Sequence, residues 1–158
     1  MNILIRITEV IMVSFVLTMM TSCHWDDTIY HHYYSVNDPW LQHEVVIFEL
    51  PVFEKGGAYS VEVDVRYSKS FPYHDLWLLV QHNVEDSATW KIDTIKCSLF
   101  NAAGYSSGDG LVGIFQLTTP FTTSLTPDGS SCARIKVKHC MSDSLLRGIT
   151  DVGIRVKQ

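Results

Sequence analysis

The sequence lacks both a basic block and the short motifs of several common enzyme classes. Its 12 lysine and arginine residues are outnumbered by 17 acidic residues, and the net charge of −5 disfavours nucleic acid and anionic lipid head groups as partners. No GxSxG elbow sets up a nucleophilic serine. The glycine-rich stretch 104–110 precedes neither a helix nor a lysine, so it does not cradle phosphates as a P-loop does. We therefore expect no enzyme activity, no catalytic residue, no cofactor and no nucleic-acid partner.

Metal-binding patterns are missing as well. Neither CxxC nor HxxxH spacing occurs, and zinc sites are commonly built on such spacings. His24, His31 and His32 gather near the N-terminus, but adjacent histidines of an extended strand point in opposite directions. We find no carboxylate or cysteine that completes a ligand set with them. A polar tether is the better interpretation, and no metal site is expected.

The chain has no apolar run of the roughly 20 residues that a membrane-spanning helix needs. The apolar stretch Val10–Met20 follows a single positive residue, Arg6, and is too short for such a helix. The tetrapeptide MTSC at 20–23 follows, and small residues before a cysteine resemble the lipobox of bacterial lipoproteins. We interpret residues 1–22 as a signal peptide and Cys23 as the mature N-terminus, whose sulfur carries the lipid. The alternative is an ordinary secretory signal with a chance cysteine.

The residues directly after Cys23 carry the signals that sort a lipoprotein to one membrane or the other. His24 follows rather than aspartate, so the inner-membrane retention signal of some bacteria is absent. Asp26 and Asp27 resemble the surface-export signal of some Bacteroidetes lipoproteins, and they are equally explained as part of a solvated tether. Two or three acyl chains, at ~0.8 kcal/mol per buried CH₂ group, hold a protein on a membrane. We expect an envelope protein anchored to the outer membrane, with the membrane face left open.

Period-2 alternation of apolar and polar residues dominates the rest of the chain. It is clearest over 59–67, where odd positions are apolar and even positions polar, as in a half-buried antiparallel strand. Residues 76–80 are apolar on both faces, which predicts a central strand covered on both sides. In 90–100 the apolar phase slips by one residue, which predicts a bulge near Asp93 and Thr94. The predicted strands are 44–50, 59–67, 76–80, 90–100, 111–117, 121–125, 133–139 and 152–156.

These strands define the expected architecture. No convincing helix follows the signal peptide, and the glycine-rich segment 103–110 is predicted to be the loop of a hairpin. About eight strands, with turn signals roughly every ten residues, predict an all-β fold, an antiparallel β-sandwich. We divide the chain into a signal peptide (1–22), a lipidated cysteine with a tether (23–38) and one β-sandwich domain (39–158).

With Cys23 given to the lipid, three cysteines remain, namely Cys97, Cys132 and Cys140. An odd number leaves at least one thiol unpaired within the chain. If 133–139 is one continuous strand, its flanking cysteines lie ~26 Å apart at ~3.3 Å per residue, which is too far for a disulfide. A bond would therefore join Cys97 to one of the other two. Cys97 shares the inward phase of its strand, and we favour a buried core thiol there.

Phe71, Tyr73 and Trp77 stand out as an aromatic group around Pro72. Aromatic platforms can stack on sugar rings or anchor a partner, and we mark these three residues as a candidate interaction surface. The other interpretation is packing that closes the mouth of the sandwich, which is the more common role of large aromatic side chains.

Two residues near the C-terminus are predicted to have structural roles. Gly153, inside the last predicted strand, lets a neighbouring chain segment approach because it has no side chain. Asp151 is expected to cap the turn that begins at Gly148.

Four segments carry a resemblance to a known family. They are FPYHDLWLLV (71–80), DTIKCSL (93–99), GYSSGDG (104–110) and LRGITDVGIRV (146–156), in this order. They resemble the YPY-x-NLW, DTL, Gly-Trp-x-Gly-x-Gly and L-x-GI-x-DVG segments of the GldH gliding-motility lipoprotein family of Bacteroidetes. Asp75 and Tyr105 depart from the family's Asn and Trp, and the three cysteines after Cys23 are not part of its pattern.

The resemblance implies a non-enzymatic lipoprotein linked to gliding motility and the type IX secretion machinery. Its partners would be the membrane, through the lipid on Cys23, and proteins of that machinery. The alternative function is that of an envelope lipoprotein that binds a glycan or peptide through Phe71, Tyr73 and Trp77.

Overall fold

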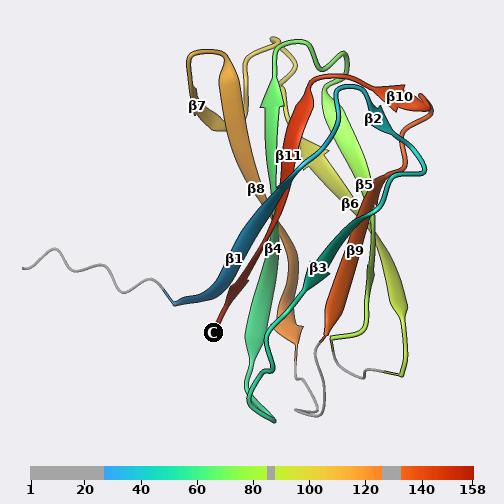
Figure 1. The fold of residues 1–158 in the computed structure, drawn as a ribbon. Coiled ribbons are helices and arrows are strands. Elements are labelled where there is room, and N and C mark those ends of the chain that lie inside the picture. Colours follow the sequence, from blue (N-terminus) through green and yellow to red (C-terminus); the bar gives the residue numbers. More distant parts are fainter. Residues whose placement is uncertain (1–26, 85–87, 126–132) are drawn as a thin grey trace, which may run out of the picture.

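Two antiparallel sheets lie face to face in the computed structural model of this chain, which describes residues 27–84, 88–125 and 133–158 (Figure 1). Within these ranges there is no helix, and so none that could cross a membrane. All strand pairs are antiparallel. The predicted fold class, an all-β antiparallel sandwich, is confirmed.

One layer is a five-stranded sheet in the order β1-β11-β4-β8-β7, and the other is a four-stranded sheet in the order β3-β9-β5-β6. The short pair β10-β2 lies at the top of Figure 1. The strands are β1 Thr28–Ser35, β2 Trp40–Leu41, β3 Val46–Glu49, β4 Tyr59–Ser68, β5 Asp75–His82, β6 Lys91–Ser98, β7 Asp109–Leu111, β8 Ile114–Leu125, β9 Arg134–His139, β10 Leu145–Leu146 and β11 Ile149–Lys157.

Period-2 alternation builds the core between the sheets. In β4 the odd positions point inward, and Val61, Val63 and Val65 are fully buried. Leu78 and Val80 of β5 enter the same core from the other sheet and are also fully buried. Each such side chain contributes roughly 1.5–3 kcal/mol when it is removed from water, so the alternation read from the sequence is also the main source of stability.

The expectation for residues 76–80 is partly wrong. β5 lies between β9 and β6, so the predicted central position is confirmed. Its second face is not covered, however, because Trp77 is 42% exposed and Leu79 is only half-buried. The described part of the chain contains no helix that could cover that face.

The N-terminal boundary of the domain has to be corrected. The sequence predicts a tether over 23–38, but Thr28–Ser35 form β1, which pairs with β11 along its length. β1 is an edge strand in which polar and exposed residues predominate, so it lacks the alternation that marks the other strands. The sandwich therefore begins at Thr28 and not at residue 39.

The bulge predicted in 90–100 is also wrong. β6 pairs with β5 from Lys91 to Ser98 without a shift in register. The change of apolar phase has another outcome: Ile92 is exposed, whereas Ile95 and Cys97 are buried. Exposure of one isoleucine at the sheet edge costs less than a break in the ladder of hydrogen bonds.

The glycine-rich segment 103–110 connects the two sheets, so it is not the loop between two paired strands, although its first part closes one isolated antiparallel bridge, Phe100 with Ser106. It follows β6 of the smaller sheet and leads into β7 of the larger one. Tyr67 of β4 holds this crossing in place. Its buried hydroxyl donates to the Leu99 carbonyl at 2.8 Å and accepts from the Gly108 amide at 3.0 Å.

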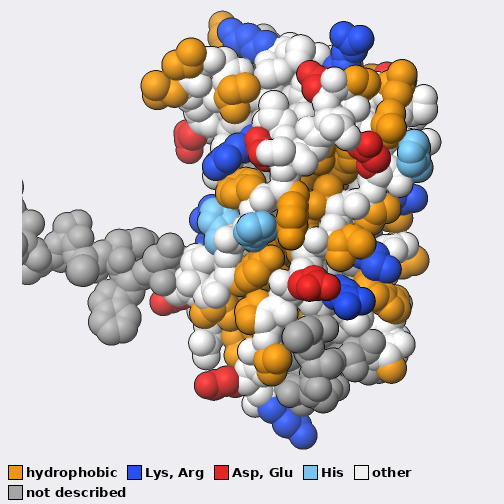
Figure 2. Space-filling model, viewed as in Figure 1, with side chains coloured by type: hydrophobic (Ala, Val, Ile, Leu, Met, Phe, Trp, Pro, Cys, Tyr) orange, Lys and Arg blue, Asp and Glu red, His pale blue; other side chains and the backbone are white. Residues whose placement is uncertain are grey.

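The hairpin of this region is instead β7–β8, which turns at Val112 and Gly113. Leu111 and Ile114 are its last paired residues. Hydrophobic side chains gather over this hairpin at the upper left of Figure 2.

The cysteine predictions are settled for two of the four thiols. Cys97 is fully buried and free, and burial raises the pKa of its thiol. The buried core thiol predicted there is confirmed. Cys140 is exposed and free, so it is not bonded to Cys97. Cys23 and Cys132 lie outside the described residues.

Candidate functional site

The predicted lipidation site, Cys23, lies outside the described residues, and its lipidation stays a prediction. The described chain starts at Asp27, and β1 begins at the next residue. Residues 24–27 are thus all that separates Cys23 from the first strand. A lipid on Cys23 would hold this end of the five-stranded sheet close to the membrane.

The structure brings two of the three aromatic residues of the candidate interaction surface together: the Phe71 and Tyr73 rings pack edge to face with their centres 5.8 Å apart. Phe71 belongs to the core, and Tyr73 is half-buried, with its hydroxyl donating to Asp143 Oδ2 at 2.6 Å. Trp77 alone is exposed, on the outer face of β5, where Lys96 Nζ lies 6.0 Å from its ring centre. The three side chains therefore do not share one exposed platform.

The N-terminal histidines also take different positions. His31 and His32 are adjacent in β1, and the extended backbone turns them to opposite faces. His31 Nε2 lies 2.8 Å from Asp64 Oδ2, whereas His32 packs edge-on against Tyr34. Among the described residues, no group of three or more His, Cys, Asp or Glu side chains is placed to hold a metal ion.

A polar cluster on the outer face of the five-stranded sheet is the main feature that the sequence did not predict. Strand pairing places Tyr33, Gly153, Asp64 and Thr118 in one row across β1, β11, β4 and β8. The next row brings His31 and Arg155 to the same face. We call the hydrogen-bonded side chains the Asp64 cluster; they are His31, Tyr33, Asp64, Thr118 and Arg155.

Asp64 is fully buried, although it points away from the core. Its Oδ2 lies 2.8 Å from His31 Nε2, and it accepts from the Tyr33 hydroxyl at 3.0 Å and from Arg155 Nη2 at 3.2 Å. Thr118 Oγ1 donates to the other oxygen, Oδ1. Four side chains from three other strands thus satisfy both oxygens, as the burial of a charge requires.

The cluster shifts the pKa values of its members. Burial acts to raise the pKa of Asp64, but the Thr118 hydrogen bond and the Arg155 charge outweigh it and hold that pKa below its ordinary value. Burial and the Asp64 carboxylate raise the pKa of Tyr33 to about 12. Burial acts to lower the pKa of Arg155, but the same carboxylate outweighs it, so that pKa is raised. At neutral pH the cluster therefore holds a carboxylate, a neutral phenol and a guanidinium.

Further charged side chains extend the cluster along the sheet. Lys157 Nζ lies 2.8 Å from Glu62 Oε2, and Arg155 Nε lies 3.9 Å from the same oxygen. On the other side of the row, the Arg66 guanidinium lies 4.0 Å from the centre of the Tyr33 ring. The Tyr33 ring is thus covered by a cation, an arrangement that favours a fixed ring position.

Gly153 makes room for this ring. A Cβ built at Gly153 would lie 2.7 Å from Cδ1 and Cε1 of Tyr33, closer than real side-chain carbons approach. The predicted close approach at Gly153 is confirmed, and the approaching group is the Tyr33 side chain of β1. The carboxylate of Asp151, which was expected to cap a turn, accepts from the Ser35 hydroxyl of β1 at 2.8 Å.

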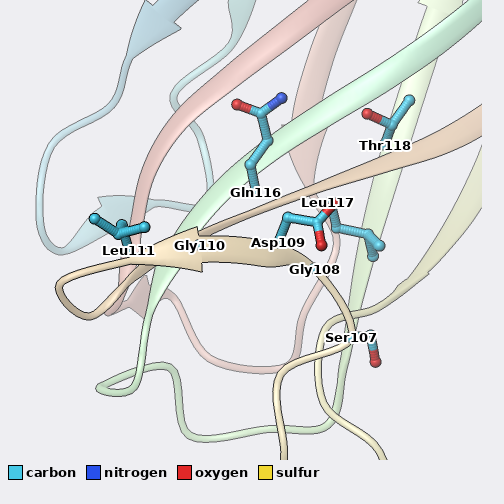
Figure 3. Close-up of a pocket in the computed structure, with 8 residues that line it drawn as sticks. All are labelled: Ser107, Gly108, Asp109, Gly110, Leu111, Gln116, Leu117 and Thr118. Carbon is cyan, nitrogen blue, oxygen red and sulfur yellow. The ribbon is translucent and has the colours of Figure 1, made fainter.

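An open pocket of about 780 Å³ lies beside the cluster, at the β7–β8 hairpin. Figure 3 shows Gln116 and Thr118 rising from β8 on one side, with Asp109 of β7 next to them. Thr118 belongs to both the pocket and the Asp64 cluster, and Gln116 accepts a hydrogen bond from Arg66 Nε at 3.2 Å. The lining residues are Ser107, Gly108, Asp109, Gly110, Leu111, Gln116, Leu117 and Thr118.

The geometry of the Asp64 cluster suits a structural role better than a chemical one. Asp64 has no exposed surface and both of its oxygens are occupied, so it is not within reach of a substrate proton. Tyr33, with a pKa of about 12, keeps its proton at neutral pH. The network ties β1 to β11, β4 and β8, and so fixes the strand that follows the predicted anchor.

The fold and the site together define a class: an antiparallel β-sandwich that follows a lipoprotein-type N-terminal sequence and whose outer face holds a buried carboxylate, Asp64, satisfied by four side chains of the same sheet. Comparison with protein families gives the narrower assignment. The model of the GldH lipoprotein family matches residues 28–156, and the chain belongs to this family. The match runs from the first residue of β1 almost to the end of β11, so it spans both sheets. The resemblance found in four short segments is confirmed.

Two relatives illustrate the family. The Gliding motility lipoprotein GldH of Flavobacterium johnsoniae is 28% identical over 137 residues, which cover 82% of this chain and 84% of the relative. The Gliding motility lipoprotein GldH homolog of Christiangramia forsetii is 22% identical over 151 residues and 91% of each chain. Solved structures are more distant: the C-terminal domain of EclA, a sugar-binding protein, has a TM-score of 0.35 at 13% identity over 88% of this chain and 81% of that one.

Proposed function

We propose that this chain is a lipid-anchored, non-catalytic component of the cell envelope that acts in gliding motility together with the type IX secretion machinery. The observation that carries the proposal is the family match over residues 28–156, which covers both sheets except for the last residue of β11. Both relatives are named as gliding motility lipoproteins, which supports the same role here.

A role without catalysis is supported by the state of two side chains that could take part in chemistry, Cys97 and Asp64. The Cys97 thiol is buried, and the Asp64 carboxylate is enclosed by its four partners. A protein of this kind would act by holding other proteins. We therefore assign its partners to proteins of the motility and secretion machinery, and its anchor to the outer membrane through the lipid on Cys23.

Deletion of the gene in the source organism tests this function. We expect loss of gliding, or in a strain that does not glide, a reduced amount of type IX substrates in the culture medium. A plasmid copy of the full chain should restore the phenotype. A deletion strain with normal motility and normal secretion would contradict the proposal.

A second candidate function is the binding of an envelope glycan or peptide. It is supported by Trp77, which is exposed on β5 with a lysine beside its ring. If this function holds, the Trp77→Ala variant should lose binding to isolated envelope polysaccharide in a pull-down. The matched control is Trp90→Ala, since Trp90 has a similar exposure of 40% and also lies beside a lysine, Lys136. Equal binding by both variants and by the unmodified chain would exclude Trp77 as a binding residue.

A further inference from the structure

The tip of the β7–β8 hairpin exposes an unusual amount of apolar surface. Leu111 is 83% exposed and Val112 is 94% exposed, and the next side chain, Ile114, is also exposed. We call residues 111–114 the hairpin tip. Single exposed apolar residues are normal on a protein surface, but three within four residues form a contiguous patch that points to a partner.

The backbone conformation of the hairpin tip is a second reason to expect a function there. Val112 and Gly113 form a two-residue turn with φ values of 56° and 86°. Turns with two positive φ values favour Asn-Gly, and a β-branched residue is a genuine outlier in this conformation. Valine therefore neither eases the turn nor fills the core, so folding does not explain its presence. Strain of this kind is a reason to look for a function at the site.

The hairpin tip lies at the end of the five-stranded sheet that is farther from the predicted lipid anchor. Thr28 of β1 pairs with Lys157, which pairs with Ser60 at the start of β4, whereas Ile114 pairs with Ser68 at the end of β4. These two ends of the five-stranded sheet lie ~26 Å apart at ~3.3 Å per residue. In Figure 1 the hairpin is at the top, and β1 begins at the lower left. Only residues 24–27 lie between Cys23 and β1, so the anchor holds the opposite end of the sheet from the tip.

The charge of the hairpin also disfavours a lipid surface as its partner. Residues 109–116 contain one aspartate and no lysine or arginine. Segments that enter a membrane surface combine apolar residues with cations that meet the lipid head groups, and this hairpin has none of its own. Both its position and its charge favour a protein surface over a lipid surface.

We propose that the hairpin tip inserts Leu111, Val112 and Ile114 into an apolar pocket of a partner protein in the envelope. The proposal rests on the proposed function in that it takes the partner from the machinery to which the chain is anchored. A few side chains in well-packed pockets carry most of the affinity of a typical interface. Burial of apolar surface is the main favourable contribution to most protein association, and the three side chains of the tip offer such surface.

Site-specific photo-crosslinking in cells tests the proposal with the full-length lipoprotein. A photo-reactive amino acid is placed at position 111, and the matched control carries it at Val52, which is 62% exposed and lies outside the hairpin. We expect a product of the chain with a different protein from position 111 and none from position 52. A product of two copies of this chain, an adduct to lipid only, or equal products from both positions would overturn the proposal.

A second variant separates contact from folding. Val112→Asn supplies the residue that this turn favours, so we expect a higher Tm for the purified protein. The same substitution removes an apolar anchor, so the crosslink from position 111 should fall by about tenfold, the change that 1.4 kcal/mol produces. The proposal is supported by this loss of crosslinked product, and not by the capture of a protein alone. An unchanged yield of crosslinked product from the Val112→Asn variant would contradict it. Because the crosslink requires no motility, a deletion strain without a phenotype would end the proposed function but leave this test valid.

Discussion

The Asp64→Ala variant is expected to lower the free energy of unfolding by about 3–5 kcal/mol, the usual cost of removing one partner from a buried ion pair. Asp64 has no exposed surface, and its removal leaves Arg155 without its closest carboxylate. The Tyr33 and Thr118 hydroxyls lose their acceptor in the same step. Since a domain of this size is stabilised by roughly 5–15 kcal/mol in total, the loss is a large fraction of its stability. Urea unfolding followed by tryptophan fluorescence measures it.

The control for this prediction is an exposed ion pair on the other sheet. Glu49 lies 3.4 Å from Arg134, and their side chains are 71% and 54% exposed. Glu49→Ala should change the free energy of unfolding by no more than about 1 kcal/mol, because solvent screens exposed pairs. If Asp64→Ala costs no more than Glu49→Ala, the cluster does not fix β1 as we describe.

The contribution of Asp64 to the free energy of unfolding should also depend on pH, and the direction of this dependence follows from its pKa. The folded-state pKa lies below the ordinary value of about 3.9. The carboxylate therefore stabilises the fold fully above pH ~4, and this contribution is lost as the pH falls through the folded-state value. The difference in stability between the unmodified chain and Asp64→Asn should be largest near neutral pH and should shrink in acid. A difference that grows as the pH falls would contradict the assigned shift.

The core strands could be predicted from sequence because their signal is local. In 59–67 each inward residue is apolar and each outward residue polar, and β4 runs over Tyr59–Ser68. The inward positions bury their side chains against the opposite sheet whatever the identity of the partner. Period 2 is therefore enough to find the strand and its inner face.

The Asp64 cluster could not be predicted in this way. In the sequence, Asp64 is one more polar residue between valines, and only strand pairing brings it next to Tyr33, which is 31 positions away, and Arg155, which is 91 positions away. For the same reason the sequence does not indicate β1. Its side chains are fixed by hydrogen bonds to distant strands and only in part by an apolar face, and such bonds leave no periodic trace in the sequence. Gly153 was the one local signal of the cluster, since a glycine inside a strand marks a close approach.

Replacing Cys23 with alanine should release the protein from the membrane entirely. Two acyl chains hold a protein stably, while a single chain gives only marginal, reversible binding, so a chain with no lipid has no anchor of this kind. Within the described residues, no helix is long and apolar enough to cross a membrane. Cell fractionation should move the variant from the membrane to the soluble fraction, and radiolabelled palmitate should no longer be incorporated.

Cys140→Ala is the matched control for this prediction. Cys140 is an exposed, free thiol within the sandwich, so it is the described cysteine most open to adventitious acylation. This variant should keep both the label and the membrane location, because we predict that the position directly after the signal sequence, and not exposure of a thiol, determines which cysteine carries the lipid. The described strands run from Thr28 to Lys157, so circular dichroism of the released Cys23→Ala protein should still report a β-sandwich. Palmitate label on the Cys23→Ala chain would instead mean that another residue carries the lipid. The anchor would then not be tied to the start of β1, and the orientation inferred for the hairpin tip would be wrong.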